Sequence, residues 1–192
     1  MRDVCRVPVA VLISATLLSA CDSAENAPTP APSAPAAIEA SLHTAQQSYP
    51  RGTVPKIEMV LRNSGAQSCK LPTAATGAIE VTSVVRDGQA VIGKGGTDDY
   101  YNGLSSVVAS TLRDVAPGES LTVPLDVQTI PNGPPTLVGS TQTSSDRGRT
   151  TSWPLDVPGR YRVTARPAKV AGVSDMCAVP NGTSAVEFEV QS

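Results

Sequence analysis

The stretch Lys56-Ile57-Glu58-Met59-Val60-Leu61-Arg62-Asn63-Ser64-Gly65 decides the fold class. Its apolar residues at 57, 59 and 61 alternate with charged ones at 56, 58 and 62. This period of two sends successive side chains to opposite faces of a β-strand. The run stops at Asn-Ser-Gly, a composition that favours a turn. The segment therefore predicts a strand with one buried and one exposed face.

The same alternation recurs between residues 38 and 190. It predicts further strands at Ile38–Leu42, Ile79–Val85, Ala90–Ile92, Val107–Leu112, Leu121–Val127, Gly159–Ala165 and Val186–Val190. Asp87-Gly88 lies between two of these runs and accepts the positive φ angles of a tight hairpin. Pro124 cannot donate to a ladder, so we expect its strand to lie at an edge, to bulge, or to be unpaired on one side there.

About seven short strands separated by turn signals predict an all-β domain over residues 38–192, built as a single antiparallel β-sandwich. The segments Ala116-Pro117-Gly118-Glu119 and Val157-Pro158-Gly159-Arg160-Tyr161-Arg162-Val163 resemble those of bacterial extracytoplasmic immunoglobulin-like domains. The resemblance gives Tyr161 the role of the corner tyrosine near the start of the sixth strand. It is made of turn and strand patterns, so it bears on the fold rather than on function.

Residues 1–20 have the features of a removable export signal. Arg2 and Arg6 precede an apolar run from Val7 to Ala20, which at 14 residues is too short to span a bilayer. The run ends in Leu18-Ser19-Ala20-Cys21, which resembles the lipobox of bacterial lipoproteins. The resemblance implies cleavage before Cys21 and attachment of palmitate-type acyl chains to its thiol. Residues 21–37 would then be the lipidated cysteine and a disordered linker rich in Ala and Pro.

Two of the four cysteines remain in the folded part of the chain, namely Cys69 and Cys177. Export exposes them to an oxidising compartment, where a lone pair more often forms a disulfide than a metal or catalytic site. Neither lies in a predicted strand. In an immunoglobulin-like sandwich, the two loops that carry them emerge at the same end, so we expect a disulfide between them.

The sequence offers little support for catalysis, a metal or a cofactor. His43 is the only histidine and falls on the polar face of the first predicted strand, where we expect a surface residue without function. Gly93-Lys94-Gly95-Gly96-Thr97 lacks the spacing of a nucleotide loop, so we expect a flexible connection. The net charge of −2 and the absence of a basic stripe disfavour nucleic-acid binding.

The best candidates for partner binding are loops. Asp98, Asp99, Tyr100 and Tyr101 belong to the densest polar and aromatic cluster of the chain, and tyrosines supply stiff contact area at low entropic cost. A second candidate is the long Ser/Thr-rich segment 128–152, which we expect to be a loop that is either functional or disordered. Trp153 ends that segment and either packs onto the sandwich or serves as a contact residue.

We therefore expect a monomeric lipoprotein anchored in the cell membrane through Cys21, with its domain on the extracytoplasmic side. Its expected function is that of a non-enzymatic module that binds an envelope or surface protein or a glycan. Two alternatives stay open: a protease-inhibitor-like domain, and a structural envelope component without a specific ligand.

Overall fold

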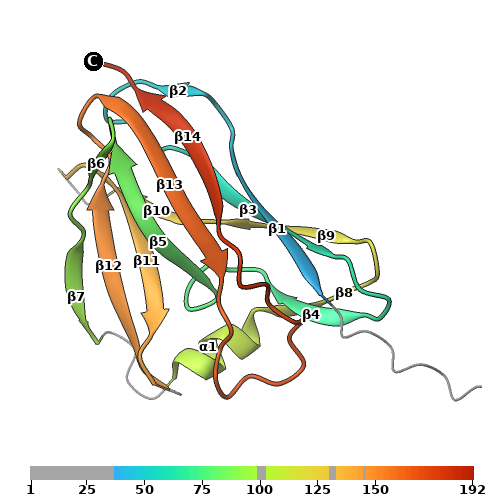
Figure 1. The fold of residues 1–192 in the computed structure, drawn as a ribbon. Coiled ribbons are helices and arrows are strands. Elements are labelled where there is room, and N and C mark those ends of the chain that lie inside the picture. Colours follow the sequence, from blue (N-terminus) through green and yellow to red (C-terminus); the bar gives the residue numbers. More distant parts are fainter. Residues whose placement is uncertain (1–36, 99–102, 130–132, 145) are drawn as a thin grey trace, which may run out of the picture. The chain divides into compact units, whose positions relative to one another are not determined.

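The protein folds as an all-β domain, as its alternating sequence predicts. In the computed structural model, the described residues are 37–98, 103–129, 133–144 and 146–192. These residues form fourteen strands and one short helix. Seven of the described strands are seven or more residues long, and the others are short. Figure 1 shows their arrangement.

The strands form four sheets in which all but one of the pairings are antiparallel. The first contains, in spatial order, β1 (Ile38–Thr44), β3 (Ile57–Asn63) and β9 (Ser120–Pro124). The second contains β10 (Asp126–Thr129), β11 (Pro135–Gln142), β12 (Gly148–Pro154) and β7 (Lys94–Asp98). The third contains β2 (Ser48–Tyr49), β14 (Ser184–Val190), β13 (Gly159–Pro167), β5 (Ile79–Arg86) and β6 (Gln89–Ala90). The fourth is the pair β4 (Cys69–Pro72) and β8 (Leu112–Val115).

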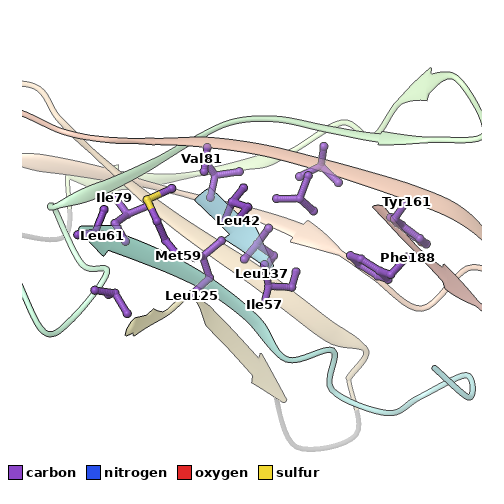
Figure 2. Close-up of a cluster of buried hydrophobic side chains, with 14 of the residues drawn as sticks. Leu42, Ile57, Met59, Leu61, Ile79, Val81, Leu125, Leu137, Tyr161 and Phe188 are labelled. Carbon is purple, nitrogen blue, oxygen red and sulfur yellow. The ribbon is translucent and has the colours of Figure 1, made fainter. Parts of the chain in front are cut away.

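The core is formed by the inward faces that the sequence alternation marks. On β3, Ile57, Met59 and Leu61 are almost fully buried. Figure 2 shows them with other buried side chains of the same cluster, namely Leu42, Ile79, Val81, Leu125, Leu137, Tyr161 and Phe188. One cluster thus joins all four sheets, because it also contains Leu71 of β4 and Val115 of β8. Most of its members are Leu, Val and Ile, so nonpolar burial at about 25 cal/mol per Å² is its main stabilising term.

The predicted hairpin is confirmed, and the environment of Tyr161 is defined. Val85 pairs with Ala90 and Arg86 with Gln89, and the two turn residues Asp87 and Gly88 have φ angles of 48° and 80°. This is the positive-φ geometry that Asp-Gly favours. Tyr161 is fully buried, stacks on Phe188, and donates a 2.9 Å hydrogen bond from its hydroxyl to the carbonyl of Val157. A corner tyrosine makes this type of bond to the backbone a few residues upstream.

The predicted strand over Val107–Leu112 is wrong. Its first part belongs to helix α1 (Leu104–Ser110), and only Leu112 joins a strand, β8. Leu104 and Val108, four residues apart, are both fully buried, whereas Val107 is 39% exposed. One buried face at a spacing of four residues is a helical pattern, which the neighbouring apolar residues conceal in the sequence.

Two predicted connections and two predicted strands are also corrected. Residues 94–97 are not a flexible connection but lie in β7, and most of segment 128–152 lies in β10, β11 and β12 rather than in a loop. The predicted strand Leu121–Val127 is divided at Leu125, so that β9 pairs with β3 and β10 pairs with β11. β9 lies at the edge of its sheet, where a strand containing Pro124 is tolerated. Strand β6 ends at Ala90, which leaves Ile92 outside it and 86% exposed.

Candidate functional site

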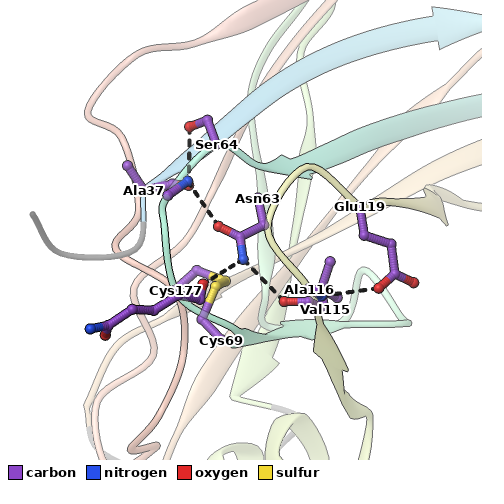
Figure 3. Close-up of a disulfide and its surroundings, with 10 residues drawn as sticks. Ala37, Asn63, Ser64, Cys69, Val115, Ala116, Glu119 and Cys177 are labelled. Carbon is purple, nitrogen blue, oxygen red and sulfur yellow. Dashed lines mark hydrogen bonds between the residues drawn. A yellow bond between two sulfur atoms is a disulfide. The ribbon is translucent and has the colours of Figure 1, made fainter. Parts of the chain in front are cut away.

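The predicted disulfide between Cys69 and Cys177 is present, with a Cα–Cα distance of 5.1 Å. Cys177 is buried, and Cys69 begins β4, so the expectation that neither cysteine lies in a strand is wrong for Cys69. Figure 3 shows the bond and its surroundings. The disulfide joins the start of β4 to the segment between β13 and β14 across a sequence separation of 108 residues.

Asn63 lies beside the disulfide and organises the neighbouring turns (Figure 3). Its side chain is fully buried at the end of β3. The side-chain amide donates to the carbonyls of Gln67 at 2.8 Å and Val115 at 3.0 Å, and its oxygen accepts from the backbone N–H of Gly65 at 3.0 Å. The sequence marks Asn63 only as a turn residue. A buried side chain with every bond satisfied is a tertiary feature that the pattern could not show.

The disulfide fixes one wall of a groove. We call residues 168–183, which connect β13 to β14, the wall segment. Backbone hydrogen bonds hold it to β4: the N–H of Lys70 donates to the carbonyl of Asp175, and that of Cys177 to the carbonyl of Lys70, both at 3.1 Å. At the start of β1, the N–H of Ile38 donates to the carbonyl of Ala178 at 3.3 Å.

Apolar contacts and a side-chain amide support the other half of the wall segment. Val170 is buried in a small cluster with Ala78 and the α1 residues Leu104 and Val108. The Gln142 side chain accepts from the N–H of Ala171 at 2.9 Å and donates to its carbonyl at 3.3 Å. The wall segment has no strand or helix of its own, yet hydrogen bonds, the disulfide and a buried side chain anchor it between Ala168 and Ala178. Helix α1 therefore serves to support the wall.

The groove has a volume of about 880 Å³, within the range of sites that bind small ligands or short segments. Its opposite side is formed by the ends of three strands, through Glu80 of β5, Thr141 and Gln142 of β11, and Arg166 of β13. The wall segment contributes Lys169, Asp175 and several apolar side chains. The apolar contributors are Pro167 at the end of β13 and Val170, Val173, Met176, Val179 and Pro180 of the wall segment.

The charges of the groove fall into two groups. Glu80 and Arg166 neutralise each other, since Nε and Nη2 of the guanidinium both lie 2.7 Å from the same carboxylate oxygen. Lys169 and Asp175 are exposed and have no ion-pair partner among the described residues. Asp175 also has φ of 68°, a left-handed conformation that non-glycine residues adopt mainly when the surroundings impose it.

Of the five binding residues predicted from sequence, Trp153 is the one whose side chain the structure describes. Asp98 ends β7, and Asp99, Tyr100 and Tyr101 fall outside the described residues. Trp153 lies in β12, half-buried, and packs against the main core. Its ring approaches the backbone closely, because a Cβ at Gly93 would lie 2.7 Å from its Nε1 and one at Gly139 would lie 3.0 Å from its Cζ3. Trp153 is not among the described residues that line the groove.

The described residues contain no group of three or more potential metal ligands. His43 is exposed on β1, as predicted, and its Nε2 lies 2.8 Å from the hydroxyl of Ser41. Neither residue lines the groove.

Within the described part of the chain, no helix has the length and apolar character needed to cross a membrane. No known protein family model and no curated protein matches this chain.

Sequence reasoning missed the groove residues, although one signal was available. The connection between β13 and β14 is long for a compact domain and carries one of the two cysteines. Long connections with a fixed covalent anchor are frequent places for binding sites.

Proposed function

We propose that this chain is an exported lipoprotein, anchored to the cell membrane through lipid on Cys21, whose extracytoplasmic domain is a non-enzymatic binding module. The groove beside the disulfide is its binding site. The observation that carries the proposal is the fixed wall segment, which combines a covalent bond, backbone hydrogen bonds to two strands and a buried apolar contact. A wall held in this way loses little conformational freedom when a partner binds.

The immunoglobulin-like resemblance and the lipobox both support an extracytoplasmic scaffold. The 2.9 Å bond of the Tyr161 hydroxyl to the Val157 carbonyl is the interaction that the resemblance implies for this residue. A disulfide between Cys69 and Cys177 is suited to an oxidising compartment.

The place where the tether joins the domain bears on the partner. Ala37 forms a bridge with Ala178 of the wall segment, so the chain enters the domain beside the groove. The C-terminus lies at the other end of the domain (Figure 1). The 15 residues between Cys21 and Ala37 would span about 45 Å if extended by their prolines. A tether of this length would bring an envelope protein or glycan within about that distance of the membrane surface into reach of the domain.

Metabolic labelling with a palmitate analogue tests the anchor. The wild-type protein is expected to carry the label and to sediment with membranes, and Cys21→Ser is expected to lose both properties. Label that survives Cys21→Ser would contradict lipidation at this residue.

Photo-crosslinking in intact cells tests the binding site. A photoreactive amino acid at Asn181, which lines the groove, is expected to give a discrete adduct, whereas one at Gln89 on the exposed β6 is not. A third variant carries the photoreactive residue at Tyr100. Adducts from position 100 without any from position 181 would move the site to the loop predicted from sequence and contradict the groove.

A further inference from the structure

The groove carries two opposite charges that nothing in the described domain neutralises. Lys169 and Asp175 both belong to the wall segment and both line the groove. They do not pair with each other, and within the described residues the Asp175 carboxylate has a single polar contact, a 3.5 Å approach by the hydroxyl of neighbouring Ser174. By contrast, four Arg–Glu pairs and the Arg86–Asp87 pair show that charged side chains of this domain commonly pair across neighbouring strands or turns.

The surface between these charges is apolar. Val173 and Met176 are half-buried there and pack against the small cluster of Val170 and α1. Asp175 also keeps its left-handed backbone, with its carbonyl bound to the N–H of Lys70 at 3.1 Å. The backbone of Asp175 is therefore held by β4.

We infer that the groove binds an extended peptide segment of a partner protein, one that presents an acidic side chain to Lys169, a basic side chain to Asp175 and apolar side chains between them. This inference rests on the proposed binding function and adds the class of ligand. Charge complementarity favours a peptide, because a neutral glycan would leave both charges unused. A nucleic acid would meet the unpaired carboxylate of Asp175.

The probe is a phage-displayed library of random dodecapeptides. The library is selected on the full chain with the Cys69–Cys177 disulfide intact, so that the peptides meet the folded domain of residues 37–192. Enriched peptides are expected to carry one acidic and one basic residue at a preferred spacing. The dissociation constants of synthetic copies are then measured against charge variants of the domain at low and high salt.

Lys169→Gln and Asp175→Asn are each expected to weaken binding about two- to fivefold, the effect of one exposed ion pair. Asn is chosen at 175 because it tolerates a positive φ. Lys169→Glu is expected to bind better than wild type when the acidic residue of the peptide is replaced by Lys. Lys94→Gln on β7, an exposed lysine outside the groove, is the matched control and is expected to have no effect.

The outcomes separate the two proposals. Peptides that bind the groove with equal affinity for all charge variants would overturn the inference and leave the binding function standing. Neutral oligosaccharides that bind the groove while no peptide is enriched would also overturn it. No binding of peptide or glycan together with no crosslink from position 181 would contradict both.

Discussion

Removal of the disulfide is expected to destabilise the domain strongly and to loosen the groove first. In the chain-entropy model, a closed loop of 108 residues corresponds to roughly 4.8 kcal/mol at 25 °C. Residual structure in the unfolded chain lowers the measured value, so we expect a loss of about 3 to 5 kcal/mol. A domain of this size has a total unfolding free energy of about 5 to 15 kcal/mol, so the loss is a large share of it.

The assay is urea unfolding of the wild-type protein with and without dithiothreitol, and of the double variant Cys69→Ala/Cys177→Ala. The reduced wild type lacks the disulfide but keeps both sulfur atoms. The difference in unfolding free energy between the reduced wild type and the double variant therefore reports only the packing of the two thiols. The double variant itself should be insensitive to dithiothreitol. Amide hydrogen exchange is expected to accelerate in the wall segment before it accelerates in β3 or β13, because the wall segment has no ladder of its own.

Two results would refute this reasoning. A loss of less than about 1 kcal/mol on reduction would mean that the long loop is already constrained in the unfolded chain. Unchanged exchange in the wall segment would mean that the hydrogen bonds to Lys70 and Ile38 hold it without the covalent bond.

Three further predictions concern the framework. Asn63→Ala removes three hydrogen bonds inside the domain and is expected to lower the free energy of unfolding in urea by about 2 to 4 kcal/mol. Ser64→Ala, on the exposed side of the same turn, should lower it by less than about 1 kcal/mol. Burial raises the pKa of Tyr161, against the opposing effects of Arg86 and of the bond to Val157. The contribution of the neutral phenol to the free energy of unfolding is therefore fully present below about pH 10 and is lost as pH rises through the folded-state pKa. Tyr161→Phe should lack this component of the alkaline loss, and an identical pH profile for both proteins would contradict it. Gly93→Ala would bring a Cβ to 2.5 Å from the Thr151 side chain. It is expected to lower the free energy of unfolding by about 1 to 3 kcal/mol and to shift the fluorescence of the single tryptophan. Gly95→Ala, whose Cβ meets no atom within 4 Å, should do neither.

The parts of the fold that the sequence predicts are those where burial follows a strict period. On β3 and β13, every second side chain is buried, so hydropathy alone reveals the strands. Strand β11 is not predicted by the same pattern, because polar Thr136 and Ser140 are buried along it. Their burial removes the contrast in hydropathy between the two faces of the strand. Helix α1 escapes because only Leu104 and Val108 mark its buried face over seven residues.

The disulfide was predictable because it needs only two cysteines in an oxidising compartment. The groove was not, because its two sides are far apart in the chain: Glu80 and Thr141 lie on strand ends, and Asp175 lies on the wall segment. Residue patterns along one segment carry no information on such an approach. The position of the wall segment depends on its bonds to Lys70 and Gln142, which are tertiary contacts.

The most direct test of the groove as the binding site is amide chemical-shift mapping with a bound partner. The ligand is either the protein crosslinked through position 181 or the peptide with the highest affinity from the selection. The account predicts shifts concentrated at Thr141, Gln142 and residues 166–181, and their loss on reduction of the Cys69–Cys177 bond. Shifts confined to β1, β3 and β9, or to residues 98–103, with the groove unchanged, would contradict it.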